Sequence, residues 1–166
     1  MLVILDTNVY LHHPDEVQKL DFNRLLDVRG YNIHIVVPMI VLDQLDDQKQ
    51  GKDKAVRNRA RRTLKKIDEV LPDPTGIGVL RKADSSALQV GGIPRGEVTI
   101  ELLFDPPRHE RLPIDDDEIV DRIVAFQPLA QGAITLVTYD TGHATRARAA
   151  GIRVRKLAHE LDDEGG

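Results

Sequence analysis

The feature that most constrains the fold is the unbroken apolar run at residues 2–5, which ends abruptly in Asp6, Thr7 and Asn8. A short apolar run with a β-branched centre is typical of a strand buried on both faces, as in parallel sheets. Ligands bind beyond the carboxyl ends of the strands in such sheets, so this run places Asp6 where chemistry usually occurs. Taken alone, Asp6 could equally cap the next segment or begin a turn.

Further apolar runs alternate with helical patterns along the chain. Strands are predicted at 33–37, which is closed by Pro38, and at 134–137, with a last short strand at 152–154. Apolar residues at helical spacing predict helices over 39–48, from 49 towards Pro72, after 118, and over 141–150. This alternation predicts an α/β fold with a doubly wound, mostly parallel central sheet and helices on both faces.

Residues 72–113 interrupt that pattern, because proline and glycine recur there and no helical spacing survives. Strands are predicted at 78–83 and 97–104, and we interpret them as a β-hairpin insertion. With 166 residues, the chain is expected to form one domain over 1–158, followed by an acidic tail at 159–166 that should fray.

The composition restricts the chemistry. The chain has no cysteine, which excludes disulfides, zinc–thiolate sites and cysteine nucleophiles, and which fits the reducing cytoplasm. No basic leader precedes the first strand and no apolar stretch reaches membrane-spanning length, so neither a signal peptide nor a membrane partner is expected. A net charge of -4 would argue against nucleic acid if the charge were evenly spread, but it is not.

Basic residues are concentrated in residues 49–66, which contain a single acid, Asp53. Like charges four residues apart on a helix repel each other, so such a one-signed run is more than an ordinary solvated face. An anionic partner such as a phosphate backbone would account for it. The residues predicted to bind nucleic acid are Lys49, Lys52, Lys54, Arg57, Arg61, Arg62 and Lys65.

Acidic residues are concentrated at the start of another predicted helix, at residues 115–118. One acid would suffice to cap the helix and complement its dipole, whereas packed carboxylates repel and raise each other's pKa. A bound cation would relieve that repulsion. Asp6, Asp140, the pair at 43–44 and the pair at 116–117 can converge on one edge of the sheet. Carboxylate oxygens without histidine or cysteine select Mg²⁺ or Mn²⁺, which suits metal-assisted phosphodiester hydrolysis.

These segments resemble the PIN (PilT N-terminal) domains, a ribonuclease family. The resemblance rests on residues 6–8 after the first strand, 36–42 before an acidic helix, 116–119, and 137–140 with 146–152 following. It covers the chain except for residues 72–113. Among PIN domains, the sequence most resembles those fused to phosphate-starvation-type ATPases, although the sequence contains no ATPase domain or P-loop.

The resemblance implies a metal-dependent endoribonuclease that acts on RNA with Mg²⁺ or Mn²⁺. The family's metal-binding acids fall on Asp6, Asp116 and Asp140, with Asp117 beside them and with Asn8 and Thr138 as supporting polar groups. The sequence departs from the family at Gln44, where a glutamate is usual. An amide offers an oxygen without a charge, so Asp43, which we include among the catalytic acids, or Asp47 would have to compensate.

Several alternatives remain open at this stage. The chain is either a nuclease or a PIN domain that binds nucleic acid without cleaving it. A toxin ribonuclease held by a protein inhibitor, and a homodimer, are also compatible with the sequence. A haloacid-dehalogenase-like phosphatase would need aspartate where Asn8 stands, and a receiver domain would need paired acids before the first strand's aspartate.

Overall fold

The computed structural model describes residues 1–159, so the predicted tail at 159–166 lies outside the described residues except for its first residue. A six-stranded sheet with the order β3-β4-β2-β1-β5-β6 forms its centre. Every neighbouring pair is parallel except β3 and β4, which are antiparallel. The strands are β1 (Leu2–Leu5), β2 (Ile33–Pro38), β3 (Gly78–Arg81), β4 (Val98–Leu103), β5 (Ile134–Thr138) and β6 (Arg153–Lys156). The predicted mostly parallel α/β sheet is confirmed.

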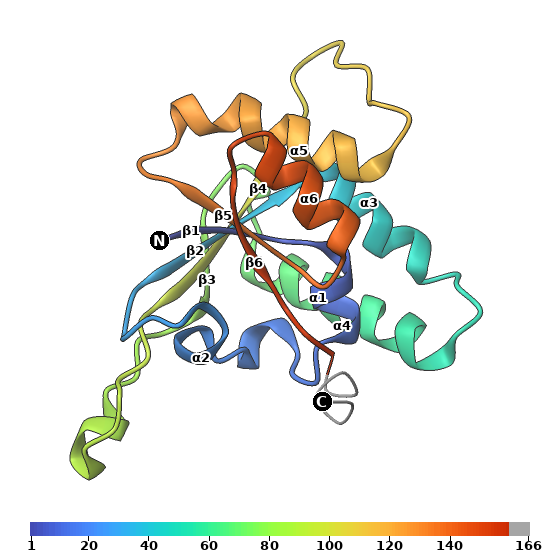
Figure 1. Ribbon diagram of the computed structural model, residues 1–166. Helices are drawn as coiled ribbons and strands as arrows, with labels where there is room; N and C mark the ends of the chain where they lie inside the picture. The colour runs from blue at the N-terminus through green and yellow to red at the C-terminus, as the bar shows by residue number, and fades with distance from the viewer. Residues whose placement is uncertain (160–166) are drawn as a thin grey trace.

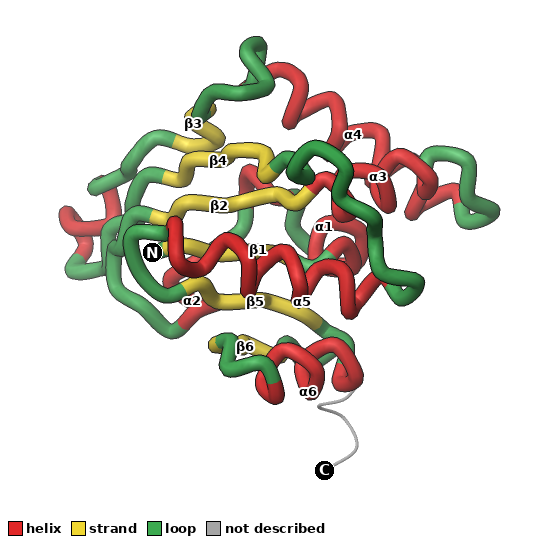
Figure 2. Tube along the Cα trace, turned by 90° about the horizontal axis from the view of Figure 1, so that it is seen from above, coloured by secondary structure: helices red, strands yellow, loops and turns green. Residues whose placement is uncertain are grey.

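Helices cover both faces of the sheet. In Figures 1 and 2, α5 and α6 lie on one side, whereas α1, α2 and α4 lie on the other. The α-helices are α1 (Thr7–His12), α2 (Phe22–Leu26), α3 (Met39–Gln48), α4 (Lys54–Val70), α5 (Asp115–Phe126) and α6 (Thr141–Ala149). Three short 3-10 helices are η1 (Val17–Lys19), η2 (Ser86–Val90) and η3 (Gln127–Leu129). Among residues 1–159, no helix combines the length and apolar content needed to cross a membrane.

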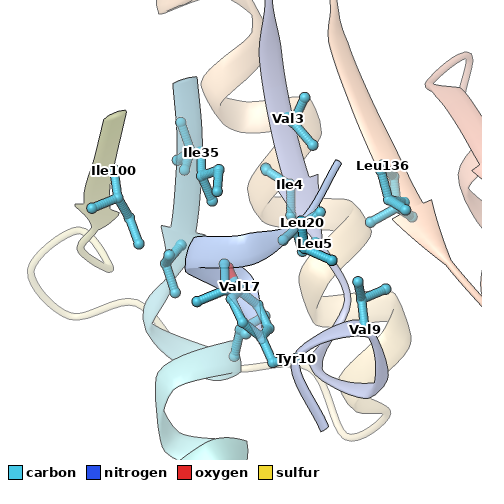
Figure 3. Close-up of a cluster of buried hydrophobic side chains, with 14 of the residues drawn as sticks. Val3, Ile4, Leu5, Val9, Tyr10, Val17, Leu20, Ile35, Ile100 and Leu136 are labelled. Carbon is cyan, nitrogen blue, oxygen red and sulfur yellow. The ribbon is translucent and has the colours of Figure 1, made fainter. Parts of the chain in front are cut away.

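The core is built around β1, which lies between β2 and β5. Val3, Ile4 and Leu5 are fully buried, and residues from η1 and the neighbouring strands pack around them (Figure 3). Because helices cover both faces, successive side chains of this strand all enter apolar surroundings. The unbroken apolar run at the start of the sequence is therefore explained by the position of its strand.

The predicted hairpin in residues 72–113 has a larger role than that of an insertion. Its two strands pair as expected, but β4 also pairs in parallel with β2 over Ile33–Pro38. The strand is therefore an integral member of the central sheet. Gly96, just before β4, allows close packing, since a Cβ atom there would lie 2.1 Å from the carbonyl oxygen of Tyr31.

The parallel order brings the ends of β1, β2 and β5 to one edge of the sheet. Asp6 follows β1, α3 begins directly after β2, and Asp140 follows β5 by two residues. The first turn of α5 lies near the same place, because α5 packs against both α3 and α6. Four segments that are distant in sequence therefore meet at this edge.

Candidate metal-binding active site

A hollow of about 250 Å³ opens at this edge of the sheet. It is lined mainly by polar side chains from α1, α3, α5 and the two strand ends: Asp6, Thr7, Asn8, Leu11, Gln44, Asp47, Gln48, Asp115, Asp116 and Asp140. Six of the residues predicted from sequence are therefore brought together here, namely Asp6, Asn8, Gln44, Asp47, Asp116 and Asp140.

Asp6 is the most enclosed acid of the hollow, with 5% of its surface exposed. Its Oδ1 accepts a hydrogen bond from the Thr7 backbone N–H at 2.8 Å, so the capping role considered from the sequence is present. Its Oδ2 accepts a second hydrogen bond from the Thr138 hydroxyl, also at 2.8 Å. These bonds hold the carboxylate in one orientation and leave it on the wall of the hollow.

Thr138 connects the two strand ends. In addition to donating to Asp6, its hydroxyl oxygen accepts the backbone N–H of Asp140 at 3.0 Å. Asp140 caps α6, with Oδ1 accepting the backbone N–H of His143 at 2.6 Å. The supporting role predicted for Thr138 stays a prediction, and the hydrogen bonds give it a physical basis.

Asp116 contributes the third carboxylate, from the first turn of α5. Partial burial and the negative charges of Asp6 and Asp140 raise its pKa above the ordinary value, although His143 and Arg146 oppose that shift. The contributions of Asp6 and Asp140 to this pKa shift reflect repulsion between the ionised carboxylates. The repulsion expected from the sequence is therefore present between acids from three different segments.

His143 lies fully buried beneath these acids. Its Nδ1 is 3.2 Å from Oδ2 of Asp6 and 3.7 Å from Oδ1 of Asp116. Burial alone would lower its pKa, but the interaction with Asp6 and the charges of Asp116 and Asp140 raise the pKa above the ordinary value. A protonated His143 therefore offsets part of the negative charge of the site.

This shift predicts a pH dependence of stability in the cation-free protein. The folded-state pKa of His143 is raised, so its stabilising contribution is complete below its unfolded-state pKa of about 6.5 and is lost as the pH rises through the folded value. With EDTA present, His143→Gln should therefore destabilise the protein more at pH 6 than at pH 9 in urea unfolding. The exposed His12→Gln should show no such trend, and an equal cost of His143→Gln at both pH values would contradict the assignment.

Gln44 occupies the position where a glutamate was expected. Its Oε1 accepts a hydrogen bond from the Thr7 hydroxyl, and its Nε2 donates to Oδ2 of Asp115 at 3.0 Å. Both ends of the amide are therefore used within the wall of the hollow. A glutamate would lose the donor to Asp115 and place a second carboxylate beside it.

Two predicted acids point elsewhere. Asp43 forms an ion pair with Nη1 of Arg111 at 2.6 Å and is absent from the hollow's lining among the described residues. Asp117 lies 3.1 Å from Nε of Arg146. Of the two carboxylates considered as substitutes for a glutamate at position 44, the geometry favours Asp47, which lines the hollow.

The basic residues predicted to bind nucleic acid lie at the end of α3, in the connection that follows and along α4, which packs against α1 and α3. Some of them also stabilise the fold. Nη1 of Arg57 donates to the carbonyls of Gly51 and Lys52, and Arg62 pairs with Glu16 at 2.5 Å. Lys49 pairs with Asp46 at 2.7 Å, whereas Lys52, Lys54, Arg61 and Lys65 are exposed.

The residues of the hollow fit a hard divalent cation. Three carboxylates from separate segments line it, and burial together with the charges of Asp6 and Asp140 raises the pKa of Asp116. A protonated His143 brings one positive charge to Asp6 and Asp116, so it offsets only part of the charge of three carboxylates. Oxygen-only donors of this kind suit Mg²⁺ or Mn²⁺.

Several residues of interest were not singled out from the sequence. Asp115 lines the hollow although only its neighbours were selected, and His143 was missed because a lone histidine on a helix has no distinctive spacing. The available signal was its position three residues after Asp140 on the buried face of α6, beside Ala144 and Ala147. Asp105 and His109 were also missed, and Glu118 was recognised only as a member of the acidic run at 115–118.

Comparison with known proteins agrees with this architecture. The family model for the PIN domain matches residues 3–158. No curated protein matches the sequence. A solved domain of a functionally unknown protein from Methanocaldococcus jannaschii DSM 2661 is similar in fold, with a TM-score of 0.53 and 15% sequence identity. The similarity covers 95% of this chain and 91% of that one.

Proposed function

This chain belongs to the PIN domain family, and on that premise we propose that it is an endoribonuclease that hydrolyses RNA with Mg²⁺ or Mn²⁺. Members of the family are commonly nucleases that use divalent metals. The observation that carries the proposal is the convergence of Asp6, Asp116 and Asp140 on one polar hollow. The chain contains no cysteine, which suits the reducing cytoplasm, where RNA substrates are present.

The residues of the hollow have distinct roles in this proposal. Asp6, Asp116 and Asp140 would hold the cation, which lowers the pKa of an attacking water and offsets charge that develops on the phosphate. Thr138 and the Thr7 backbone N–H orient Asp6 through the hydrogen bonds described above. Asn8, exposed at the rim, can donate its amide to a phosphate oxygen.

Two further hollows support a path for a single strand. The first hollow shares Asn8 and Asp140 with the acidic hollow and is also lined by His12, Tyr139 and His159. The rings of Tyr139 and His159 stack on each other, with their centroids 4.5 Å apart. The second hollow shares Tyr139, and its charged lining is predominantly basic: Lys19, Arg24, Arg95 and Arg155 with Asp15 and Asp21. Aromatic rings that stack on bases and a basic groove that follows the backbone are typical of single-strand binding.

The basic stretch on α4 provides a separately testable part of this proposal. On single strands, the logarithm of the binding constant falls with the logarithm of salt concentration by about 0.7 for each contacted phosphate. Changing Lys54, Arg61 and Lys65 to glutamate should therefore flatten the slope by about two units if each contacts one phosphate. Binding of a labelled single-stranded RNA at several salt concentrations, measured by fluorescence anisotropy, would give the slope.

The control carries the same change in charge on other elements, at the exposed residues Arg29, Lys82 and Arg148. It should leave the slope nearly unchanged. If both triple variants flatten the slope equally, the effect is one of net charge, and α4 is not the contact surface.

The direct test is incubation of the purified protein with labelled RNA in Mn²⁺, in Mg²⁺ and in EDTA. Cleavage in either metal and none in EDTA supports the proposal. A second candidate function, binding of RNA without cleavage, is favoured by Gln44, which removes one charge from the expected set of ligands. Salt-dependent RNA binding without cleavage in either metal would replace the first function with the second.

A further inference from the structure

A second group of potential metal ligands lies outside the hollow. Asp105 follows β4, His109 lies in the connection that leads to α5, and Glu118 is on α5 itself. Each offers one ligand atom, and the three atoms lie within 4.8 Å of one another. In Figure 1 the connection rises as a loop beyond β4 and comes down to the start of α5. None of the three belongs to the described lining of the acidic hollow.

Glu118 is the centre of this group, and it is completely buried. His109 Nε2 lies 2.5 Å from its Oε1, and the backbone N–H of Leu112 donates to its Oε2 at 2.9 Å. Burial of an ionised carboxylate costs several kcal/mol unless the charge is paired or coordinates a metal. The surroundings of Glu118 must therefore supply positive charge.

The nearby arginines supply only part of the positive charge that the buried Glu118 requires. Arg111 is shared between Asp105 at 3.0 Å and Asp43 at 2.6 Å. Arg122 lies 3.6 Å from Glu118 and 2.6 Å from Asp121. Four carboxylates thus face two guanidinium groups, which leaves two negative charges when the imidazole is neutral. In addition, Oδ1 of Asp105 is buried and has no hydrogen-bond partner among residues 1–159.

We propose that Asp105, His109 and Glu118 bind one divalent transition-metal ion, for which Zn²⁺ is the appropriate probe. One imidazole and two carboxylates are ligands that zinc accepts, and this donor set differs from the oxygen-only set of the hollow. Ligand atoms around a tetrahedral zinc ion with bonds of about 2.1 Å lie about 3.4 Å apart, so Nε2 of His109 would have to move about 1 Å away from Oε1 of Glu118. The ion would fix the connection to the first turns of α5, which carry Asp115 and Asp116.

The test is equilibrium dialysis and calorimetry of the full chain with ZnCl₂, in excess Mg²⁺ so that the acidic hollow is occupied. Wild type should bind one Zn²⁺ per chain and gain thermal stability from it. His109→Gln should weaken binding at least tenfold and lose the thermal shift. This variant should fold, because the glutamine amide can still donate to Glu118. Asp105→Asn is the second variant and should weaken binding in the same direction.

His34→Gln is the matched control. His34 also pairs with a glutamate, Nε2 to Oε1 of Glu101 at 3.0 Å, and the described residues place no third metal ligand there. The His34→Gln variant should bind Zn²⁺ as tightly as wild type, and so should Asp6→Asn. The proposal is overturned if wild type binds no stoichiometric Zn²⁺ or if both cluster variants bind it as tightly as wild type. It is also overturned if Asp6→Asn alone abolishes binding, because the ion then occupies the hollow. None of these results depends on nuclease activity.

Discussion

Replacing Asp6 with asparagine is expected to reduce metal-dependent RNA cleavage by at least about 100-fold. Loss of a residue that merely supports a metal ligand already costs about 10–100-fold, so loss of a central ligand should reach or exceed the upper value. Asp6 is the most buried acid of the hollow and is oriented by two hydrogen bonds.

The same variant separates metal binding from folding. Asparagine retains the oxygen that accepts the Thr7 N–H, and its amide can donate to the Thr138 hydroxyl, so the strand end should keep its conformation. It also removes one of the charges that repel Asp116. Thermal unfolding with and without Mn²⁺ should show that wild type is stabilised by the cation through mass action, whereas Asp6→Asn is not.

Asp68→Asn is the control for this comparison, since Asp68 is exposed on α4 and is no part of the hollow's described lining. It should retain both cleavage and the Mn²⁺-dependent shift. The assignment of Asp6 fails if Asp6→Asn shows the same Mn²⁺-dependent shift in melting temperature as wild type.

Gln44→Glu is the second change with a large expected effect, a gain of about tenfold in cation affinity and in cleavage. A tenfold gain corresponds to about 1.4 kcal/mol, a modest amount for a full charge added to the wall of a metal site. The cation-free protein should lose stability at the same time, because the amide donor to Asp115 is replaced by a second carboxylate. This hydrogen bond is exposed, so its loss should cost about 0.5–1.5 kcal/mol, the usual net contribution of an intramolecular hydrogen bond.

The experiment compares Gln44→Glu with Gln48→Glu, which adds the same charge on the same helix one turn further along the hollow's wall. Cleavage rates at several Mn²⁺ concentrations and urea unfolding in EDTA should respond strongly to the first change and weakly to the second. Unchanged cleavage by Gln44→Glu, together with loss of cleavage in Asp47→Ala, would instead mean that Asp47 already supplies the missing charge.

Much of the fold follows from local sequence patterns. The apolar runs that became β1, β2 and β5 are recognisable because a central strand is buried on both faces whatever its partners are. The stop of α6 is equally local, since Gly151 has a φ of +80°, a conformation that glycine adopts without strain. Asp6 and Asp140 were found for the same reason: each follows a recognisable strand, and parallel strands share a carboxyl edge.

The acidic run at 115–118 shows what only the tertiary structure decided. Asp115 and Asp116 face the hollow, Asp117 pairs with Arg146, and Glu118 is buried beside His109. Successive residues on a helix point about 100° apart, so the rotation of α5 determines which acid meets which surroundings. That rotation depends on how Ile119 and Ile123 pack into the hydrophobic core.

The same reason explains His143 and the placement of β4. Whether a histidine is buried beneath three acids, or a hairpin strand joins the central sheet, depends on segments far away in the chain. Thr138 and Asp6 are 132 residues apart, yet they are joined by a hydrogen bond. Local propensity determines where a strand or helix begins and ends, whereas packing between distant segments determines which side chains share a site.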